Sequence, residues 1–175
     1  MATNIKKVTN TSSGMYGGQE SVDDKLFRLS KQFPNNEVSW RAGRVFQSKK
    51  DGKWYALALA YLSVRQVQDR LSEVMGHNWQ NNHIVYGGKT VCSLGLKLDG
   101  EWIWRSDGAG DTNYEADKGA MSDSLKRAGV AWGIGRYLYD LKNTYVPCEV
   151  SKAGKFMKFS VDPWEIVRKN QSEFR

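Results

Sequence analysis

Apolar residues recur at helical spacing near the start of the chain. Val22, Leu26 and Leu29 fall three or four positions apart, so they would share one face of a helix. Ser21 can cap that helix at its first turn, and Pro34 cannot continue it. The pattern therefore predicts a short amphipathic helix that begins after Ser21 and stops before Pro34.

Two strands and a second helix are predicted next. Residues 37–46 favour a strand, and residues 54–62 favour a clearer one, because large side chains there alternate with alanines. We expect the alanine face of the second strand to pack closely on a neighbouring element. A helical repeat of apolar residues then follows Ser63, a natural cap, and ends at Gly76.

The middle of the chain carries two hairpin signals. Gly87-Gly88 and Asp99-Gly100 each stand between apolar segments, as the tight turns of antiparallel strands do. The segments around them are predicted to form an antiparallel meander, and the sequence leaves open which of its faces meets the core. A two-residue turn at Asp99-Gly100 would pair Leu96 with Ile103, Lys97 with Trp102 and Gly95 with Trp104.

Residues 112–139 have the pattern of a long helix with an acidic beginning and an apolar stripe that runs to Tyr139. Its second half contains three glycines, Gly129, Gly133 and Gly135. Each glycine costs about 1 kcal/mol relative to alanine inside a helix. We therefore expect them to allow a close backbone approach to the sheet or to a second subunit.

Together these elements predict an α+β fold in which the meander packs against the long, glycine-containing helix. Residues 1–20 are rich in Thr, Ser, Asn and Gly, and are expected to form a flexible arm ahead of a core domain at residues 21–150. Residues 151–175 are expected to form a C-terminal extension, with a short strand pair around Gly154 and a last helix at residues 164–169.

Charge and aromatic content favour a polyanionic partner. The 26 Lys and Arg residues exceed the 19 Asp and Glu residues, which gives a net charge of +7, and 12% of residues are aromatic. Basic side chains release counterions from phosphates and rings stack on exposed bases, although solubility alone would also explain the charge. No apolar run reaches the roughly 20 residues that span a bilayer. The two cysteines, Cys92 and Cys148, lack zinc-site spacing and are expected to be reduced and structural.

No catalytic motif is complete. Gly87-Gly88-Lys89-Thr90 resembles the end of a phosphate-binding P-loop, but His83 stands at the first glycine position. The acidic run from Asp107 resembles a calcium loop, but Thr112 stands where glycine is needed. We therefore expect no enzyme activity, metal or cofactor. The candidate carboxylates for a metal-dependent nuclease are Asp107, Asp111, Glu115, Asp117 and Asp123, and their spacing is not diagnostic.

Basic residues gather in two places. Lys126 and Arg127 are adjacent on the long predicted helix, and Arg127 falls opposite its apolar stripe. Arg41, Arg44 and Lys53 belong to a second cluster around the first hairpin, where they alternate with aromatic residues. Basic groups among rings suit a groove that follows the backbone of a single nucleic-acid strand, while a solvated helix face is the alternative.

Five short segments follow one another in a recognisable order between residues 39 and 140. They are Ser39-Trp40-Arg41, Lys53-Trp54-Tyr55, Gly76-His77-Asn78-Trp79, Lys97-Leu98-Asp99-Gly100 and Asp123-Ser124-Leu125-Lys126-Arg127-Ala128. In this order they resemble the annealing domain of the eukaryotic recombination mediator Rad fifty-two and its phage and bacterial single-strand annealing relatives. The resemblance implies a strand-strand-strand-helix core whose subunits join sheet edge to edge into rings or filaments.

The resemblance also implies a basic groove for single-stranded DNA. The groove contacts of the family fall here on Arg41, Tyr61, Lys126 and Arg127. Lys89 matches a second DNA contact, and we add Arg44, Lys53 and Arg136 from the basic pattern, although Arg136 could instead stabilise the helix C-terminus. The chain departs from the family at Val130, where another basic residue is usual. We also expect it to lack the partner-recruiting C-terminal region of the family, as in a minimal phage or bacterial form.

The sequence thus predicts ATP-independent binding and annealing of single-stranded DNA in homologous recombination and DNA repair. The expected partners are single-stranded DNA, further copies of the chain, and a recombinase, exonuclease or single-strand-binding protein. The expected location is the cytoplasm of a bacterial or phage-infected cell, in association with the nucleoid. Three alternatives stay open: a strand-protecting module that does not anneal, a metal-dependent nuclease, and an adaptor whose basic residues contact an acidic protein.

Overall fold

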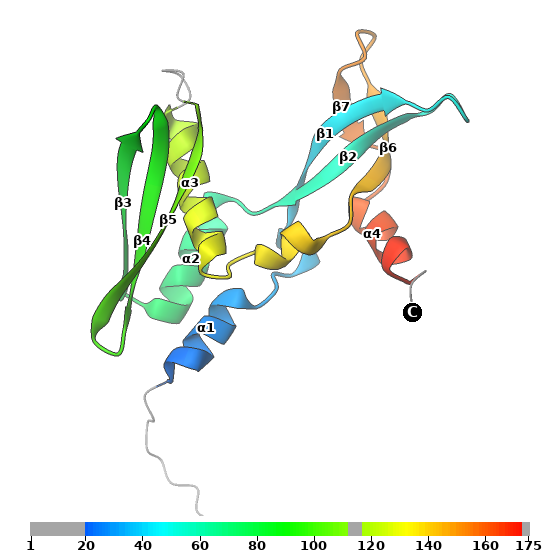
Figure 1. Ribbon diagram of the computed structural model, residues 1–175. Coiled ribbons are helices and arrows are strands. Elements are labelled where there is room, and N and C mark those ends of the chain that lie inside the picture. Colours follow the sequence, from blue (N-terminus) through cyan, green and yellow to red (C-terminus); the bar gives the residue numbers. More distant parts are fainter. Residues whose placement is uncertain (1–19, 112–116, 173–175) are drawn as a thin grey trace, which may run out of the picture.

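The computed structural model describes residues 20–111 and 117–172, which form a mixed α+β structure of two antiparallel sheets and four α-helices. The strands are β1 (Ser39–Gln47), β2 (Trp54–Tyr61), β3 (Trp79–Tyr86), β4 (Lys89–Leu98), β5 (Glu101–Asp111), β6 (Thr144–Val150) and β7 (Phe156–Phe159). The helices are α1 (Val22–Ser30), α2 (Val64–Met75), α3 (Asp117–Ala131) and α4 (Pro163–Ser172), with 3-10 turns η1 (Asn35–Glu37) and η2 (Arg136–Asp140). Figure 1 shows the two sheets as separate lobes that the helices connect.

The first two helices begin at the predicted caps. The Ser21 hydroxyl accepts a hydrogen bond from the backbone N–H of Asp24 at 3.1 Å. Ser63 and Gln66 form a reciprocal capping box at the start of α2, which ends at Gly76 with a positive φ of 58°. Because each signal lies within one helical turn, it needs no tertiary contact to act.

The sheet of β3, β4 and β5 is the predicted meander, with β4 in the centre. The three predicted pairs across the Asp99-Gly100 turn are confirmed. The side of β4 that carries Leu94 and Leu96 faces the core, and both side chains are fully buried. Helix α3 lies on this face, where the Trp132 indole N–H donates to the Leu94 carbonyl at 3.0 Å. The structure thus decides which face of the meander is covered.

The other sheet has the order β1-β2-β6-β7, and its alanine face is covered as predicted. Ala56 and Ala58 are buried, and Trp164 of α4 packs edge-on against Trp40 of β1 with ring centroids 5.1 Å apart. The predicted strand pair around Gly154 is the β6–β7 hairpin, and the predicted last helix is α4. The alanine side of β2 is therefore closely packed, and α4 contacts this sheet through β6.

The predicted long helix is wrong beyond Ala131. Helix α3 ends there because Gly133 and Gly135 adopt positive φ values of 94° and 68°, which a right-handed helix does not allow. Gly129 does mark a close approach, but its neighbour is α2 instead of the sheet: a Cβ at Gly129 would lie 2.9 Å from a methyl carbon of Val67. The first residues of the predicted helix, 112–116, lie outside the described residues.

Of the predicted arm at residues 1–20, only Glu20 lies within the described part of the chain, where its carboxylate pairs with Arg28 at 3.0 Å. No helix among the described residues is long and apolar enough to cross a membrane. Cys92 lies in β4 and Cys148 in β6; both are buried, and no disulfide joins them.

Candidate nucleic-acid interface

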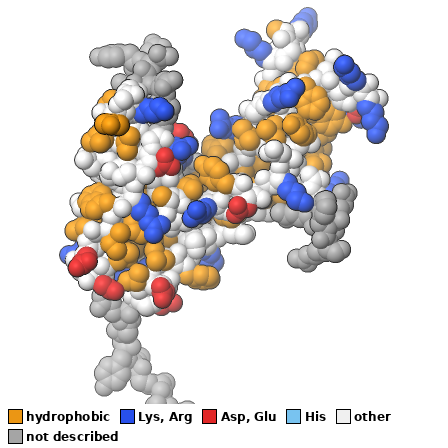
Figure 2. Space-filling view, viewed as in Figure 1, with side chains coloured by type: hydrophobic (Ala, Val, Ile, Leu, Met, Phe, Trp, Pro, Cys, Tyr) orange, Lys and Arg blue, Asp and Glu red, His pale blue; other side chains and the backbone are white. Residues whose placement is uncertain are grey.

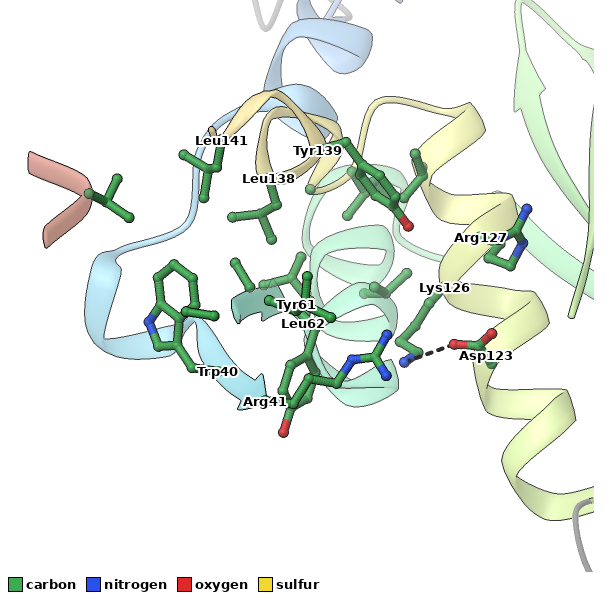
Figure 3. Close-up of a pocket in the computed structure, with 18 of the residues that line it drawn as sticks. Trp40, Arg41, Tyr61, Leu62, Asp123, Lys126, Arg127, Leu138, Tyr139 and Leu141 are labelled. Carbon is green, nitrogen blue, oxygen red and sulfur yellow. Dashed lines mark ion pairs between the residues drawn. The ribbon is translucent and has the colours of Figure 1, made fainter. Parts of the chain in front are cut away.

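An open cavity of ≈ 790 Å³ lies where β1 and β2 meet α3 and η2. We call it the inter-sheet groove. Its lining includes four of the predicted site residues: Arg41 of β1, Tyr61 of β2, and Lys126 and Arg127 of α3 (Figure 3). In Figure 2, hydrophobic and basic side chains gather along the hollow between the two lobes. The fold thus brings together residues that stand up to 86 positions apart, from Arg41 to Arg127.

Lys126 points from α3 into the groove (Figure 3). Its ammonium group lies 3.2 Å from a carboxylate oxygen of Asp123, one helical turn earlier, and 5.9 Å from the ring centre of Tyr61. A cation at that distance from an aromatic ring is weakly attracted to the ring face. Because Asp123 is half-exposed, its pairing with Lys126 is weak and open to competition from a phosphate.

Arg41 is the second cation of the groove. It lies on β1 opposite Leu59 of β2, and its guanidinium extends past Tyr61 toward Lys126 (Figure 3). Within the described part of the chain Arg41 forms no ion pair, and its side chain is exposed. Arg41 and Lys126 therefore present two positive charges to the same opening from two different elements.

Arg127 differs from its neighbour Lys126 because β5 already binds it. Its Nε and one terminal nitrogen donate to the same carboxylate oxygen of Asp107, at 3.2 and 3.1 Å. A guanidinium has five N–H donors, so the pair orients Arg127 without using all of them. Asp107 therefore fixes this side chain on the flank of α3 and lowers the net positive charge there.

The other four predicted site residues do not line the inter-sheet groove. Arg44 lies at the irregularity in β1, and Arg136 begins η2 beside the groove lining. Lys53 lies at the β1–β2 turn, next to Asp51, whose pKa is lowered by hydrogen bonds from Ser48, Tyr55 and the Lys53 backbone. Lys89 follows the Gly87-Gly88 turn at the start of β4. All four side chains are exposed on other parts of the surface.

Two lining residues were missed by the sequence analysis. Tyr139 was assigned to the apolar stripe of the long helix, but the helix ends before it, so the side chain is 69% exposed and borders the groove. Lys142 follows η2 and also lines the groove. The glycines at 133 and 135 were the available signal, since they mark the place where helical periodicity stops applying.

The lining of the groove is partly apolar and includes Leu62, Val130 and Leu138. Apolar side chains together with cations and tyrosines suit a ligand that combines phosphates with flat rings. No group of three or more His, Cys, Asp or Glu residues that could hold a metal occurs within residues 20–111 and 117–172. Of the suggested nuclease carboxylates, Asp107 and Asp123 are paired with Arg127 and Lys126.

Known proteins resemble the chain in two comparisons. A family model for the Rad52/22 family double-strand break repair protein matches residues 93–155. The single-stranded DNA-binding protein DdrA of Deinococcus radiodurans is 35% identical over 135 residues, which are 76% of this chain and 63% of that protein. The DdrA of Deinococcus deserti is 36% identical over 127 residues, which are 71% of this chain and 61% of that protein. No solved structure matches significantly.

These matches confirm the family resemblance seen in the five short segments. The family match begins in β4 and ends at the tip of the β6–β7 hairpin, so it includes Lys126, Arg127 and Asp107. It leaves out Arg41 and Tyr61, which the fold brings to the same groove. The chain spans a little under two thirds of the length of both curated relatives.

Proposed function

We propose that this chain, which is similar to the Rad52/22 double-strand break repair proteins, binds single-stranded DNA in the inter-sheet groove and anneals complementary strands without ATP. The observation that carries the proposal is the convergence of Arg41, Tyr61 and Lys126 on one open groove. The proposed setting is recombination and repair of DNA in the bacterial cytoplasm, at the nucleoid. A recombinase, an exonuclease or a single-strand-binding protein would supply or receive the strand.

Annealing in this proposal is positioning without covalent chemistry. Arg41 and Lys126 hold phosphates, while Tyr61 and Tyr139 offer rings to sugars or bases. Bases that are not hydrogen-bonded to the protein stay available to a complementary strand, so holding the strand extended removes competing folded conformations. Affinity comes mostly from phosphate contacts and therefore falls steeply with salt.

We further propose that the chain acts as a homo-oligomer, in a ring or a filament. Each sheet has two edge strands, β3 and β5 in one and β1 and β7 in the other. Open edges can pair with a neighbouring copy, and several grooves on one strand multiply weak contacts through effective concentration. The molar mass in solution, measured by light scattering with and without oligonucleotide, tests this part of the proposal; a monomer in both states contradicts it.

The decisive experiment is the annealing of two complementary fluorescent oligonucleotides with purified protein, in EDTA and without ATP. We expect duplex formation at least about tenfold faster than without protein, from the effective concentration gained on one scaffold. A parallel reaction with Mg²⁺ in place of EDTA tests the nuclease alternative: strands that are shortened with Mg²⁺ and not with EDTA would identify a nuclease. No binding of single strands at all would contradict the proposal and favour a protein-binding adaptor.

The matched variants remove equal charge at two places. Lys126→Ala with Arg127→Ala should weaken strand binding and reduce the slope of log affinity against log salt by about 0.7 to 1.4, since each phosphate contact contributes about 0.7 for a single strand. Lys25→Ala with Lys31→Ala, on and just after α1, removes the same charge away from the groove and serves as control. Equal losses in both variants would show that net charge, and not the groove, determines binding.

A second candidate function is strand protection without annealing. It is favoured by the names of the two relatives, which state single-stranded DNA binding and no annealing. The same fluorescent assay separates the two functions: tight binding with no faster duplex formation, together with resistance of the bound strand to an added exonuclease, would establish protection alone.

A further inference from the structure

The sheet of β3, β4 and β5 has one face that no described element covers. Its residues are those on the side opposite α3, and in register they are Gln80, Asn82, Ile84 and Tyr86 of β3, Lys89, Val91, Ser93, Gly95 and Lys97 of β4, and Trp102, Trp104 and Ser106 of β5. Tyr86 is 77% exposed, and Trp102 and Trp104 are 39% and 44% exposed. Figure 2 shows hydrophobic side chains at the surface of this lobe. We call this surface the outer sheet face.

Two tryptophans lie side by side on the outer sheet face. The ring centroids of Trp102 and Trp104 lie 6.1 Å apart, and the planes are tilted by 31°. Both indoles stand on the same side of β5 because the residues are two positions apart. Exposed tryptophans are costly to leave in water, so a solvent-facing pair indicates a surface that contacts something else.

Gly95 explains why the Trp104 ring can lie on the sheet. A Cβ built on Gly95 would lie 2.9 to 3.0 Å from three atoms of the Trp104 ring. Three nearly equal distances mean that the ring covers the glycine with its face, so any side chain there would lift the ring. One face of the indole therefore rests on β4, and the opposite face is presented outward.

The polar groups of the outer sheet face fit an anionic, ring-bearing ligand. Lys97 lies directly opposite Trp102 across β4 and β5, and forms no ion pair within the described part of the chain. The described side chains of this face include no carboxylate, since Asp107 points to the other side, toward Arg127. The Ser93 and Ser106 hydroxyls bond to each other at 2.8 Å, and the amides of Gln80 and Asn82 remain exposed.

We propose that the outer sheet face is a second contact for single-stranded DNA, in which unpaired bases stack on Trp102 and Trp104 and Lys97 holds a phosphate. Rings on an exposed sheet, with a cation beside them, are a sequence-tolerant way of binding unpaired bases. The proposal rests on the proposed function for its ligand. It differs in site and in type of contact, because the inter-sheet groove lies beyond α3, on the opposite side of this sheet, and acts mainly through charge.

The test compares two variants on two strands, each measured by fluorescence anisotropy. Trp102→Ala with Trp104→Ala should weaken binding of labelled oligothymidylate by about fivefold to a hundredfold, the range expected for loss of base stacking, with an unchanged salt slope. The same variant should bind an abasic sugar-phosphate strand as well as the unmodified protein does. Phe27→Ala, which removes a ring that is 72% exposed on α1, is the matched control and should change neither affinity.

Two further variants separate stacking from folding. Trp102→Tyr with Trp104→Tyr keeps aromatic rings and should recover most of the affinity, whereas Gly95→Val lifts the Trp104 ring and should lower it. Equal oligothymidylate binding by the Trp102→Ala, Trp104→Ala variant and the unmodified protein would overturn the proposal. If Lys126→Ala with Arg127→Ala still weakened binding in that case, the inter-sheet groove would be the DNA contact without the outer sheet face. A changed subunit number with unchanged affinity per subunit would make the face an interface between copies, which also overturns it.

Discussion

The two sheets bury opposite kinds of surface. On β2 the covered side carries Ala56 and Ala58, and the large ring of Trp164 comes from the covering helix α4. On β4 the covered side carries Leu94 and Leu96, which share a core cluster with Leu125 and Ala128 of α3. Ala56 and Ala58 do not belong to that cluster. The meander therefore buries whole leucine side chains against its helix, whereas β2 buries little more than alanine methyl groups.

The uncovered sides of the two sheets also differ, and this difference concerns function. The open side of β1 and β2 carries Arg41 and Tyr61 and leads into the inter-sheet groove, where cations are close together. The open side of β4 and β5 carries Trp102 and Trp104 with one nearby cation, Lys97. One surface is suited to the sugar-phosphate backbone and the other to the bases.

The largest expected effect tests the leucine-rich core. Leu94→Ala should lower the free energy of unfolding by about 3 to 5 kcal/mol, because the side chain is fully buried and the site can collapse only partly. Leu59→Ala, the same change at a half-buried position of β2, should cost clearly less. Urea unfolding followed by circular dichroism measures both, and equal losses would contradict the assigned cores.

A smaller effect is expected where Gly135, just before η2, packs against Leu62, just after β2. Gly135→Ala should cost about 2 to 4 kcal/mol, since its φ of 68° disfavours a side chain and the new Cβ would lie 2.6 Å from a Leu62 methyl group. Gly119→Ala in α3 meets no atom within 4 Å and should be neutral or stabilising by up to about 1 kcal/mol. Thermal unfolding of the two variants checks this, and a stable Gly135→Ala protein would refute this packing of Gly135 against Leu62.

The alanine-rich core should lose stability when a side chain is enlarged, whereas the leucine-rich core should lose it when a side chain is shortened. Ala56→Leu should cost about 1 to 3 kcal/mol, because the methyl group is fully buried and the extra carbons must displace neighbours. Ala153→Leu at the exposed tip of the β6–β7 hairpin should stay within about 0.5 kcal/mol of the unmodified protein. If Ala56→Leu were tolerated equally well, the alanine face would not be tightly covered.

Local signals account for what the sequence could predict of the fold. The Ser21 and Ser63 caps, the Asp99-Gly100 turn and its register all depend on residues a few positions apart, and all are confirmed. The predicted length of α3 is wrong. Apolar residues keep helical spacing past Gly133, but the backbone leaves the helical conformation there. Which side of the meander is covered depends on how helices pack on it, and periodicity within a strand cannot decide that.

The basic pattern pointed to Arg41, Lys126 and Arg127, but only the family resemblance assigned them to one groove. Nothing in the spacing of Arg41 and Lys126 shows that they meet, since their approach depends on how β1 is placed against α3. The binding of Arg127 by Asp107, 20 positions earlier, likewise needs the β5–α3 contact. The sequence predicted the strand partners of Trp102 and Trp104. It could not predict that both rings are exposed, because that depends on which face of the meander the helix covers.

The smallest expected effect concerns the buried thiol of Cys92 in the meander core. Burial raises the pKa of the Cys92 thiol to about 11 and also raises that of Cys148. Because the folded state disfavours the Cys92 thiolate, its contribution to stability is complete below the unfolded pKa near 9 and is lost as pH rises toward about 11. The urea midpoint of the unmodified protein should therefore fall more steeply from pH 9 to 11 than that of Cys92→Ala. Equal slopes would mean that the meander core admits water at Cys92, and would weaken the contrast between its covered and open faces.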